Sequence, residues 1–274
     1  MTKNSENGAA AAASPDKPPA DQQDPAAARA VPLSAERHGK LRLRRSATPY
    51  GFASGANLVA LTFHEFPAAA LSYPIVFAGP NKTPCAVMGF ESGENLFIDA
   101  KGAPTEGVYI PASLRGHPFI AAPDTKEDRL VLMIDPSSDR LSEKEGEPLF
   151  GADRKPTDMT QGALTFLGTL RARQEETLAF VEELQALDLF EEKELRTRDE
   201  PGAGEDDASE GGGRVLARYI SLSGDKLDAL SAEDLRRIGK PGRLRAVYAQ
   251  ILSLGQWAPL GARAVARRRE TKKG

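Results

Sequence analysis

The stretch PIVFAGPNKTPCAVMGFESGENLFIDA, residues 74–100, decides the fold class that this chain is expected to adopt. It holds three short apolar runs, at 74–79, 85–90 and 96–100, and the segments between them are rich in Pro, Asn, Gly and Ser. Apolar runs of this length, separated by turn-forming residues, are typical of antiparallel strands joined by short connections. The stretch therefore predicts the first strands of an antiparallel sheet.

The same rhythm continues to residue 135. Apolar runs follow at 108–110, 119–122 and 129–135, and the last two are each succeeded by a turn segment, PDTKED or PSSD. The runs are almost wholly apolar, which is typical of strands that are covered on both faces. We therefore expect an α+β fold in which a strongly bent, largely antiparallel central sheet is covered by C-terminal helices.

Smaller elements are expected before this sheet. Leu41 and Leu43 alternate with arginines, which predicts a short, half-exposed strand. An apolar run follows at 58–63, and FPAAAL at 66–71 predicts a short helix with Pro67 in its first turn.

The second half of the chain supplies the covering helices. Leucines near helical spacing predict a long helix that is capped at Thr157 or Asp158 and runs to about Leu189. A capping box that begins at Ser231 predicts a short helix ending near Gly239.

The clearest amphipathic helix comes near the end of the chain, after a strand predicted at 215–222. Its apolar residues recur at helical spacing, so this stripe is expected to dock on the core. The stripe consists of Leu244, Val247, Tyr248, Ile251, Leu252 and Gly255.

Three segments are expected to lie outside the folded body. Residues 1–32 are almost free of large apolar side chains and cannot offset their ordering entropy, so a disordered tail is predicted. The Gly-rich, acidic segment 200–213 predicts a mobile loop, and 261–274 predicts a basic, solvated tail. One α+β domain at 33–260 is left.

Charge and hydropathy exclude several classes of protein. The net charge of −3 argues against a nucleic-acid binder, although the basic residues at 263–273 could contact phosphate or anionic lipid. No run approaches the roughly 18 apolar residues of a membrane span, and no secretory signal is recognisable. A soluble, cytoplasmic protein is therefore expected, with the cell surface, reached by a route without a signal, as the alternative.

Motifs for catalysis and for metal or cofactor binding are rejected. The chain has no P-loop, no G-x-G-x-x-G and no G-x-S-x-G. His64 and Glu65 begin an H-E-x-x-H pattern, but Ala68 replaces the second histidine and Pro67 interrupts the helix. The single cysteine, Cys85, is expected in the core. No catalytic residue, metal or cofactor is therefore predicted.

Five blocks of sequence, taken together, resemble the bacterial SapC family. They are HEFPAAALSYPIVFAG (64–79), GENLFIDAKG (93–102), YIPASLRGHPF (109–119), EGEPLF (145–150) and VYAQILSLGQW (247–257). The resemblance covers roughly residues 33–260, with 200–213 as an insertion. The family takes its name from a surface-layer-associated protein, so the resemblance implies a link to the bacterial cell surface. It implies no catalytic residues, and it does not extend to the peptide-transporter permease of the same name.

Nine polar residues lie beside the apolar runs, and buried polar groups must find partners. One interpretation is a structural hydrogen-bond network that holds loops to the sheet, and the other is a ligand pocket at the sheet edge. The nine residues are His64, Glu65, Tyr73, Asn95, Asp99, Tyr109, Arg115, His117 and Gln250.

Two functions from different classes follow. The first is a non-enzymatic binding or assembly protein, with an unknown protein partner, linked to the cell surface or envelope. The alternative is a cytoplasmic enzyme, or an accessory subunit of one, acting on a small molecule or peptide. The alternative predicts a closed pocket in which His64, Glu65, His117 or Arg115 converge. A nucleic-acid binder acting through 263–273 is a third and weaker interpretation.

Overall fold

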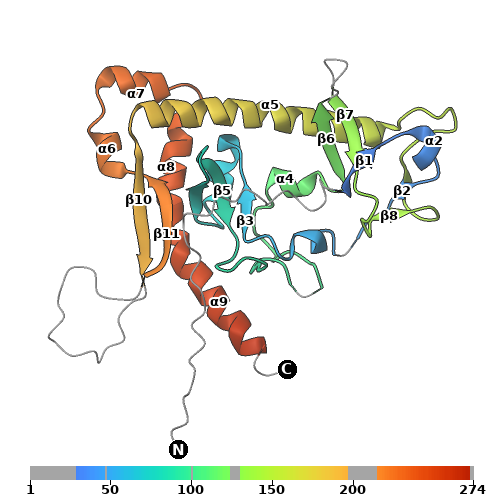
Figure 1. Cartoon of the computed structure of the whole chain (residues 1–274), viewed down its shortest axis with the longest axis horizontal. Coiled ribbons are helices and arrows are strands. Elements are labelled where there is room, and N and C mark those ends of the chain that lie inside the picture. Colours follow the sequence, from blue (N-terminus) through green and yellow to red (C-terminus); the bar gives the residue numbers. More distant parts are fainter. Residues whose placement is uncertain (1–28, 47, 100, 124–129, 197–214, 272–274) are drawn as a thin grey trace, which may run out of the picture.

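Antiparallel sheets and helices make up the protein, which confirms the predicted α+β class (Figure 1). The structure is a computed structural model that describes residues 29–46, 48–99, 101–123, 130–196 and 215–271. All strand pairs in these residues are antiparallel. None of the helices in the described part of the chain combines the length and apolar character needed to cross a membrane.

The principal sheet has five strands in the order β10-β11-β4-β5-β3. They are β10 (Phe190–Arg196), β11 (Val215–Leu222), β4 (Ile75–Ala78), β5 (Thr83–Val87) and β3 (Leu58–Ala60). The β4–β5 hairpin lies within residues 74–100, where the first strands were predicted, and β11 was also predicted. Strand β10 was not predicted, because its sequence FEEKELR is mostly charged. It nevertheless pairs with β11 from Phe190↔Leu222 to Arg196↔Val215.

The later apolar runs form a separate sheet instead of extending the first. Its order is β1-β7-β6, built from β1 (Val31–Pro32), β7 (Leu130–Ile134) and β6 (Phe119–Pro123). A small third sheet contains β8 (Leu141–Ser142), β2 (Arg42–Leu43) and β9 (Glu147–Pro148). The runs at 96–99 and 108–110 lie in loops, where side chains satisfy part of the backbone.

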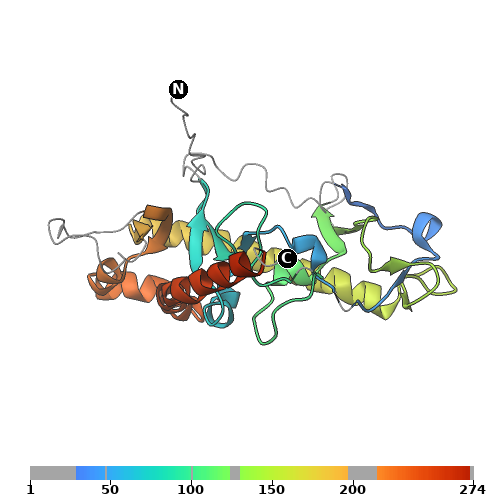
Figure 2. The same cartoon turned by 90° about the horizontal axis from the view of Figure 1, so that it is seen from below.

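One helix joins the two larger sheets. The predicted long helix is α5 (Asp158–Ala186), whose 29 residues span about 43 Å and run along most of the molecule (Figures 1 and 2). Its first half contributes Leu167 and Leu170 to a core beside β6 and β7. Its second half contributes Phe180 and Leu184 to the larger core beside the five-stranded sheet. Both cores therefore depend on the position of α5.

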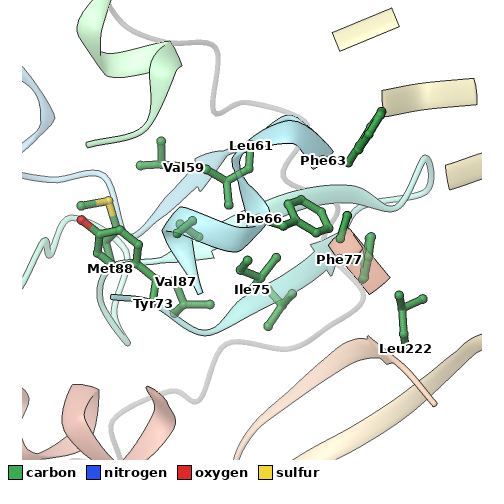
Figure 3. Packing of buried hydrophobic residues seen from close by; sticks show 14 of the residues in the cluster. Val59, Leu61, Phe63, Phe66, Tyr73, Ile75, Phe77, Val87, Met88 and Leu222 are labelled. Atoms are coloured by element: carbon green, nitrogen blue, oxygen red, sulfur yellow. The ribbon is translucent and has the colours of Figure 1, made fainter. Parts of the chain in front are cut away.

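The larger core is centred on the β4–β5 hairpin and the short helix α3 (Phe66–Ala69). Figure 3 shows the labelled apolar side chains of these elements gathered into one cluster. Within it, the rings of Phe66 and Phe77 meet edge to face with centroids 6.4 Å apart. Buried aromatic pairs in this geometry add stability beyond the area that they bury.

Among the described residues, the remaining helices are short, apart from the last two. The short helices are α2 (Ala35–His38), α4 (Ala112–Arg115), α6 (Gly224–Asp228) and α7 (Ala232–Ile238). The two longer ones are α8 (Arg243–Ser253) and α9 (Trp257–Thr271), joined through the 3-10 turn Leu254–Gln256. Helix α8 packs against β4, β11 and α3.

The apolar stripe predicted to dock α8 is only partly buried. Val247 is buried, but Leu252 is 76% exposed and Tyr248 is 48% exposed. The helix instead contacts the sheet through Ala246, Gln250 and Ser253, which are fully buried. Their small or hydrogen-bonding side chains let α8 approach the strands closely, and this rotates half of the stripe toward solvent.

Helix α9 continues into the segment that was expected to be a solvated tail. Leu260 and Ala264 are buried against the body, and the Arg267 side chain donates a hydrogen bond of 3.1 Å to the Ile98 carbonyl. The tail predicted at 1–32 reaches the described residues only at its end, where Val31 and Pro32 pair with β7. The loop predicted at 200–213 lies outside the described residues.

Truncation of two leucines tests how α8 and α9 dock. Leu260→Ala is expected to lower the free energy of unfolding by about 2–5 kcal/mol, because Leu260 is 1% exposed and its removal leaves a cavity. Leu252→Ala is the matched control and should change that energy by less than about 0.5 kcal/mol. Chemical denaturation of both variants measures the difference. Equal losses would contradict the described orientation.

Candidate functional site

Glu65 is a buried carboxylate whose oxygens are fully engaged by hydrogen-bond donors. It ends the 3-10 helix Phe63–Glu65 and is 5% exposed. One oxygen accepts from the backbone N–H and hydroxyl of Thr62, both at 2.9 Å. The other accepts from the Tyr109 hydroxyl at 2.9 Å and the Ala112 N–H at 2.7 Å. The carboxylate therefore fixes the start of α4 to the loop after β3.

Tyr109 extends this group toward the surface. Burial, reinforced by the neighbouring Glu65 charge, raises the pKa of Tyr109 to about 12, so its hydroxyl stays protonated at neutral pH. Its backbone carbonyl accepts from the buried Tyr73 hydroxyl at 2.5 Å, and burial also raises the pKa of Tyr73. The Arg115 guanidinium lies over the rings of Tyr109 and Phe166, at 5.9 and 5.6 Å.

Gln250 joins two strands of the principal sheet. Its amide nitrogen donates to the Ile75 carbonyl at 2.8 Å and to the Ser221 hydroxyl at 3.2 Å. Its amide oxygen accepts from the Leu222 N–H at 3.1 Å. One turn later, Ser253 accepts from the Ile75 N–H at 2.9 Å. The side chains of α8 therefore supply hydrogen bonds to the ends of β4 and β11.

Asn95 and Asp99 hold the loop that follows β5. The Asn95 amide donates to the Ala53 carbonyl at 3.1 Å, and its oxygen accepts from the Phe97 N–H at 3.0 Å. The Asp99 carboxylate accepts from the Ala103 N–H at 2.9 Å, and hydrogen bonds of this kind lower the pKa of Asp99. Both side chains replace the backbone partners that a strand would have provided.

His117 forms a buried pair with Asp135 beside the smaller core. Its Nε2 lies 3.5 Å from the Asp135 carboxylate, and its ring stacks on Phe52 with centroids 3.8 Å apart. Burial opposes ionisation of Asp135, but hydrogen bonds from Ser137, the contact with His117 and the charge of Arg29 together lower its pKa. Asp135 therefore remains a carboxylate at neutral pH.

His64 points in another direction, toward α5. It is exposed, stacks on Phe63 with centroids 4.0 Å apart, and its Nε2 lies 3.2 Å from the Glu176 carboxylate. Partial burial lowers the pKa of His64, and the opposing effect of Glu176 does not overcome it. The imidazole is therefore mostly neutral at pH 7.

The structure brings together four of the nine predicted polar residues. Glu65, Tyr73, Tyr109 and Arg115 form one group of contacts centred on Tyr109. The other five have partners elsewhere: His64 on Glu176, His117 on Asp135, Gln250 between β4 and β11, and Asn95 and Asp99 within their own loop.

Several partners in these contacts were not predicted. Thr62, Thr177, Ser221 and Ser253 are buried hydroxyl residues, and Asp135 is a buried acid at the end of β7. Thr177, for example, accepts from the Phe63 N–H at 3.1 Å. Isolated hydroxyl residues carry no spacing signal, because their burial arises only when distant segments pack together.

The surface has two depressions in the described part of the chain, and of the nine predicted polar residues only Asp99 lines either of them. The first has a volume of about 560 Å³ and lies beside α2. The second, about 320 Å³, is lined by Gly51, Ser54, Ile98, Asp99, Lys101, Gly102 and Arg267. In the described part of the chain, no three His, Cys, Asp or Glu side chains are grouped so as to hold a metal ion. Burial raises the pKa of Cys85 to about 12, as suits a core thiol.

Replacement of Gln250 tests its role between the strands. Gln250→Ala is expected to lower the free energy of unfolding by about 2–4 kcal/mol, because the Ile75 carbonyl and Leu222 N–H lose their partner in a buried place. Gln185→Ala, on the exposed face of α5, is the control and should have an effect below about 0.5 kcal/mol. If both variants unfold at the same denaturant concentration as the parent, the assigned role is wrong.

The lowered pKa of Asp135 predicts a pH-dependent contribution to stability. A carboxyl with a depressed pKa in the folded state stabilises the fold above its ordinary pKa of about 4, and this is lost as the pH falls. Asp135→Asn should therefore lower the free energy of unfolding by about 1–3 kcal/mol at neutral pH. The difference from the parent should shrink in acid, when the parent's carboxylate also becomes protonated.

Denaturation at several pH values checks this prediction. Asp153→Asn, at an exposed carboxylate, is the matched control and should show little difference at any pH. A gap between Asp135→Asn and the parent that persists unchanged in acid would contradict the assignment.

Comparison with known proteins gives one positive result. No curated protein and no solved structure matches the chain. The SapC family model matches residues 33–260, the span from just before α2 to the start of α9. This match covers most of the chain and agrees with the resemblance seen in its sequence blocks, so the chain belongs to the SapC family.

Proposed function

We propose that this protein is a non-enzymatic binding or assembly protein of the bacterial envelope. The observation that carries the proposal is that buried polar side chains form hydrogen bonds with the protein's own backbone. Glu65, Asn95 and Gln250 each bind backbone groups of segments distant in the sequence or of their own loop. Such contacts favour the structural interpretation of these residues, in which they hold a binding surface in shape.

The geometry of the Tyr109 group argues in the same direction. A general base needs a free lone pair aimed at its substrate, whereas four donors already occupy the Glu65 carboxylate. Tyr109, with a pKa of about 12, holds its proton at neutral pH and donates it to Glu65. His64 and His117 have partners in other places, so the convergence that an enzyme would require is not supported.

Surface side chains supply a place for a partner. Leu71 is 80% exposed at the end of α3, and Leu252 and Tyr248 are exposed on α8, against which α3 packs. Exposed large apolar side chains on neighbouring elements are typical of interaction surfaces. The surface-layer association for which the SapC family is named supports placing the partner at the envelope.

Fractionation of native cells tests this function. The full-length tagged chain is expected in the envelope fraction, in an assembly larger than a monomer by native mass measurement. Leu252→Asp should release it from that assembly. Tyr109→Phe should remain in it, although the lost hydrogen bond lowers the free energy of unfolding by about 1 kcal/mol. A monomer without partners in native extracts would sink the proposal.

A further inference from the structure

We propose that the exposed side of α8 and α9 docks the protein onto an anionic lipid surface. This inference rests on the proposed envelope function and names the partner of its apolar surface. The docking face, as we call it, is formed by six of the exposed apolar side chains on these two helices. It consists of Tyr248, Leu252, Pro259, Ala262, Val265 and Ala266.

The helices have two distinct sides. Buried residues Ala246, Gln250 and Ser253 place one side of α8 on the sheet, and Leu260 and Ala264 continue that side along α9. The docking face lies on the other side. Tyr248 and Leu252 are one turn apart on α8, and Pro259, Ala262 and Ala266 follow one another at about one turn on α9, so each set lies on one side of its helix, away from the buried residues.

The exposed residues of the docking face include large apolar side chains. Leu252 is 76% exposed and Val265 is 50% exposed. Aliphatic side chains that project from a helix enter the boundary between lipid headgroups and acyl chains, and a tyrosine ring suits the same depth. The composition of the face therefore fits a lipid interface.

The charge around the docking face is strongly positive. Residues 243–271, which include both helices, contain six arginines and one acidic residue, and two of the arginines pair with acids of other elements, Arg243 with Glu183 and Arg268 with Glu91. Arg245 lies three residues before Tyr248, and Arg269 lies three residues after Ala266, so both flank the face. An anionic headgroup layer complements this charge, and each basic side chain near such a layer strengthens binding on the order of fivefold.

The same charge argues against a second copy of the chain as the occupant. Two copies joined through this face would bring like-charged arginine-rich helices together, and like charges across an interface weaken association. An anionic lipid surface removes this repulsion. The interaction should accordingly be reversible and weaken as salt screens the charges.

Vesicle co-sedimentation with the purified full-length chain tests the inference. Phosphatidylcholine vesicles that contain phosphatidylglycerol should bind the protein, and added salt should reduce binding, whereas phosphatidylcholine alone should bind it weakly. Leu252→Asp should weaken binding by about tenfold, because the buried leucine contribution is lost. The double variant Arg245→Glu and Arg269→Glu should weaken it on the order of fivefold for each arginine.

Matched substitutions away from the face control for these changes. Leu178→Asp replaces a leucine that is 46% exposed on α5, and Lys155→Glu reverses an exposed charge in the segment before α5. Both control variants should bind phosphatidylglycerol vesicles as the parent does. Circular dichroism of every variant verifies that the fold is retained, and the arginine variants alter only exposed positions.

Three outcomes would overturn the inference. They are no binding of the parent to phosphatidylglycerol vesicles, equal loss of binding in the control variants, and light scattering that shows a dimer converted to a monomer by Leu252→Asp. If the parent protein does not bind vesicles, but Leu252→Asp still releases the protein from its assembly in cells, the docking face binds a protein. Only the lipid inference then fails, and the proposed function stands.

Discussion

The side chain of Gln250 is the connection on which the principal sheet depends. In the described residues, the register between β11 and β4 rests on the single pair Ile220↔Phe77. Gln250 bridges the neighbouring positions by bonding the Ile75 carbonyl and the Leu222 N–H from α8. Because strand pairing between β11 and β4 is so limited, the Gln250 side chain supplies further hydrogen bonds between them. These bonds hold the β10–β11 hairpin to the β4–β5 hairpin. Because the amide is fully buried, each of these bonds forms where water offers no alternative.

Helix α5 imposes the second constraint, because it is shared by both cores. Leu170 packs in the smaller core and Leu184 in the larger one. Between them, Thr177 accepts a hydrogen bond from the Phe63 N–H, next to the Glu65 carboxylate. Helix α5, the 3-10 helix Phe63–Glu65 and α4 are therefore linked by hydrogen bonds, through Thr177 on one side and the Glu65 carboxylate on the other. This arrangement explains why so many polar residues near position 65 serve the fold.

The sequence allowed the α+β class, the β4–β5 hairpin, β11, α5 and the family to be predicted, since each carries a local pattern or a set of blocks. The sequence did not allow the division into separate sheets to be predicted. The apolar pattern of the runs at 119–122 and 129–135 is the same whether these strands pair with the first sheet or with β1. It also misled on α8, where Gln250 and Ser253 occupy the buried side while Leu252 faces solvent. Hydropathy assigns the leucine to the core, whereas hydrogen bonding to the strands decides the actual orientation. The sequence showed that the nine polar residues lie beside apolar runs. It could not show their hydrogen-bond partners, because most of these partners lie on distant segments of the chain.

Strand β10 was overlooked because it is so highly charged, and that charge has a use. It forms one edge of the five-stranded sheet, where unpaired backbone groups invite a strand from another molecule. Glu192, Glu194 and Arg196 are exposed along it, and Glu194 pairs with Arg196 and Arg218. Charged side chains on an edge make the addition of a foreign strand unfavourable. Even at a high local concentration of the protein, these charges therefore disfavour aggregation and self-association by β-strand addition at this edge.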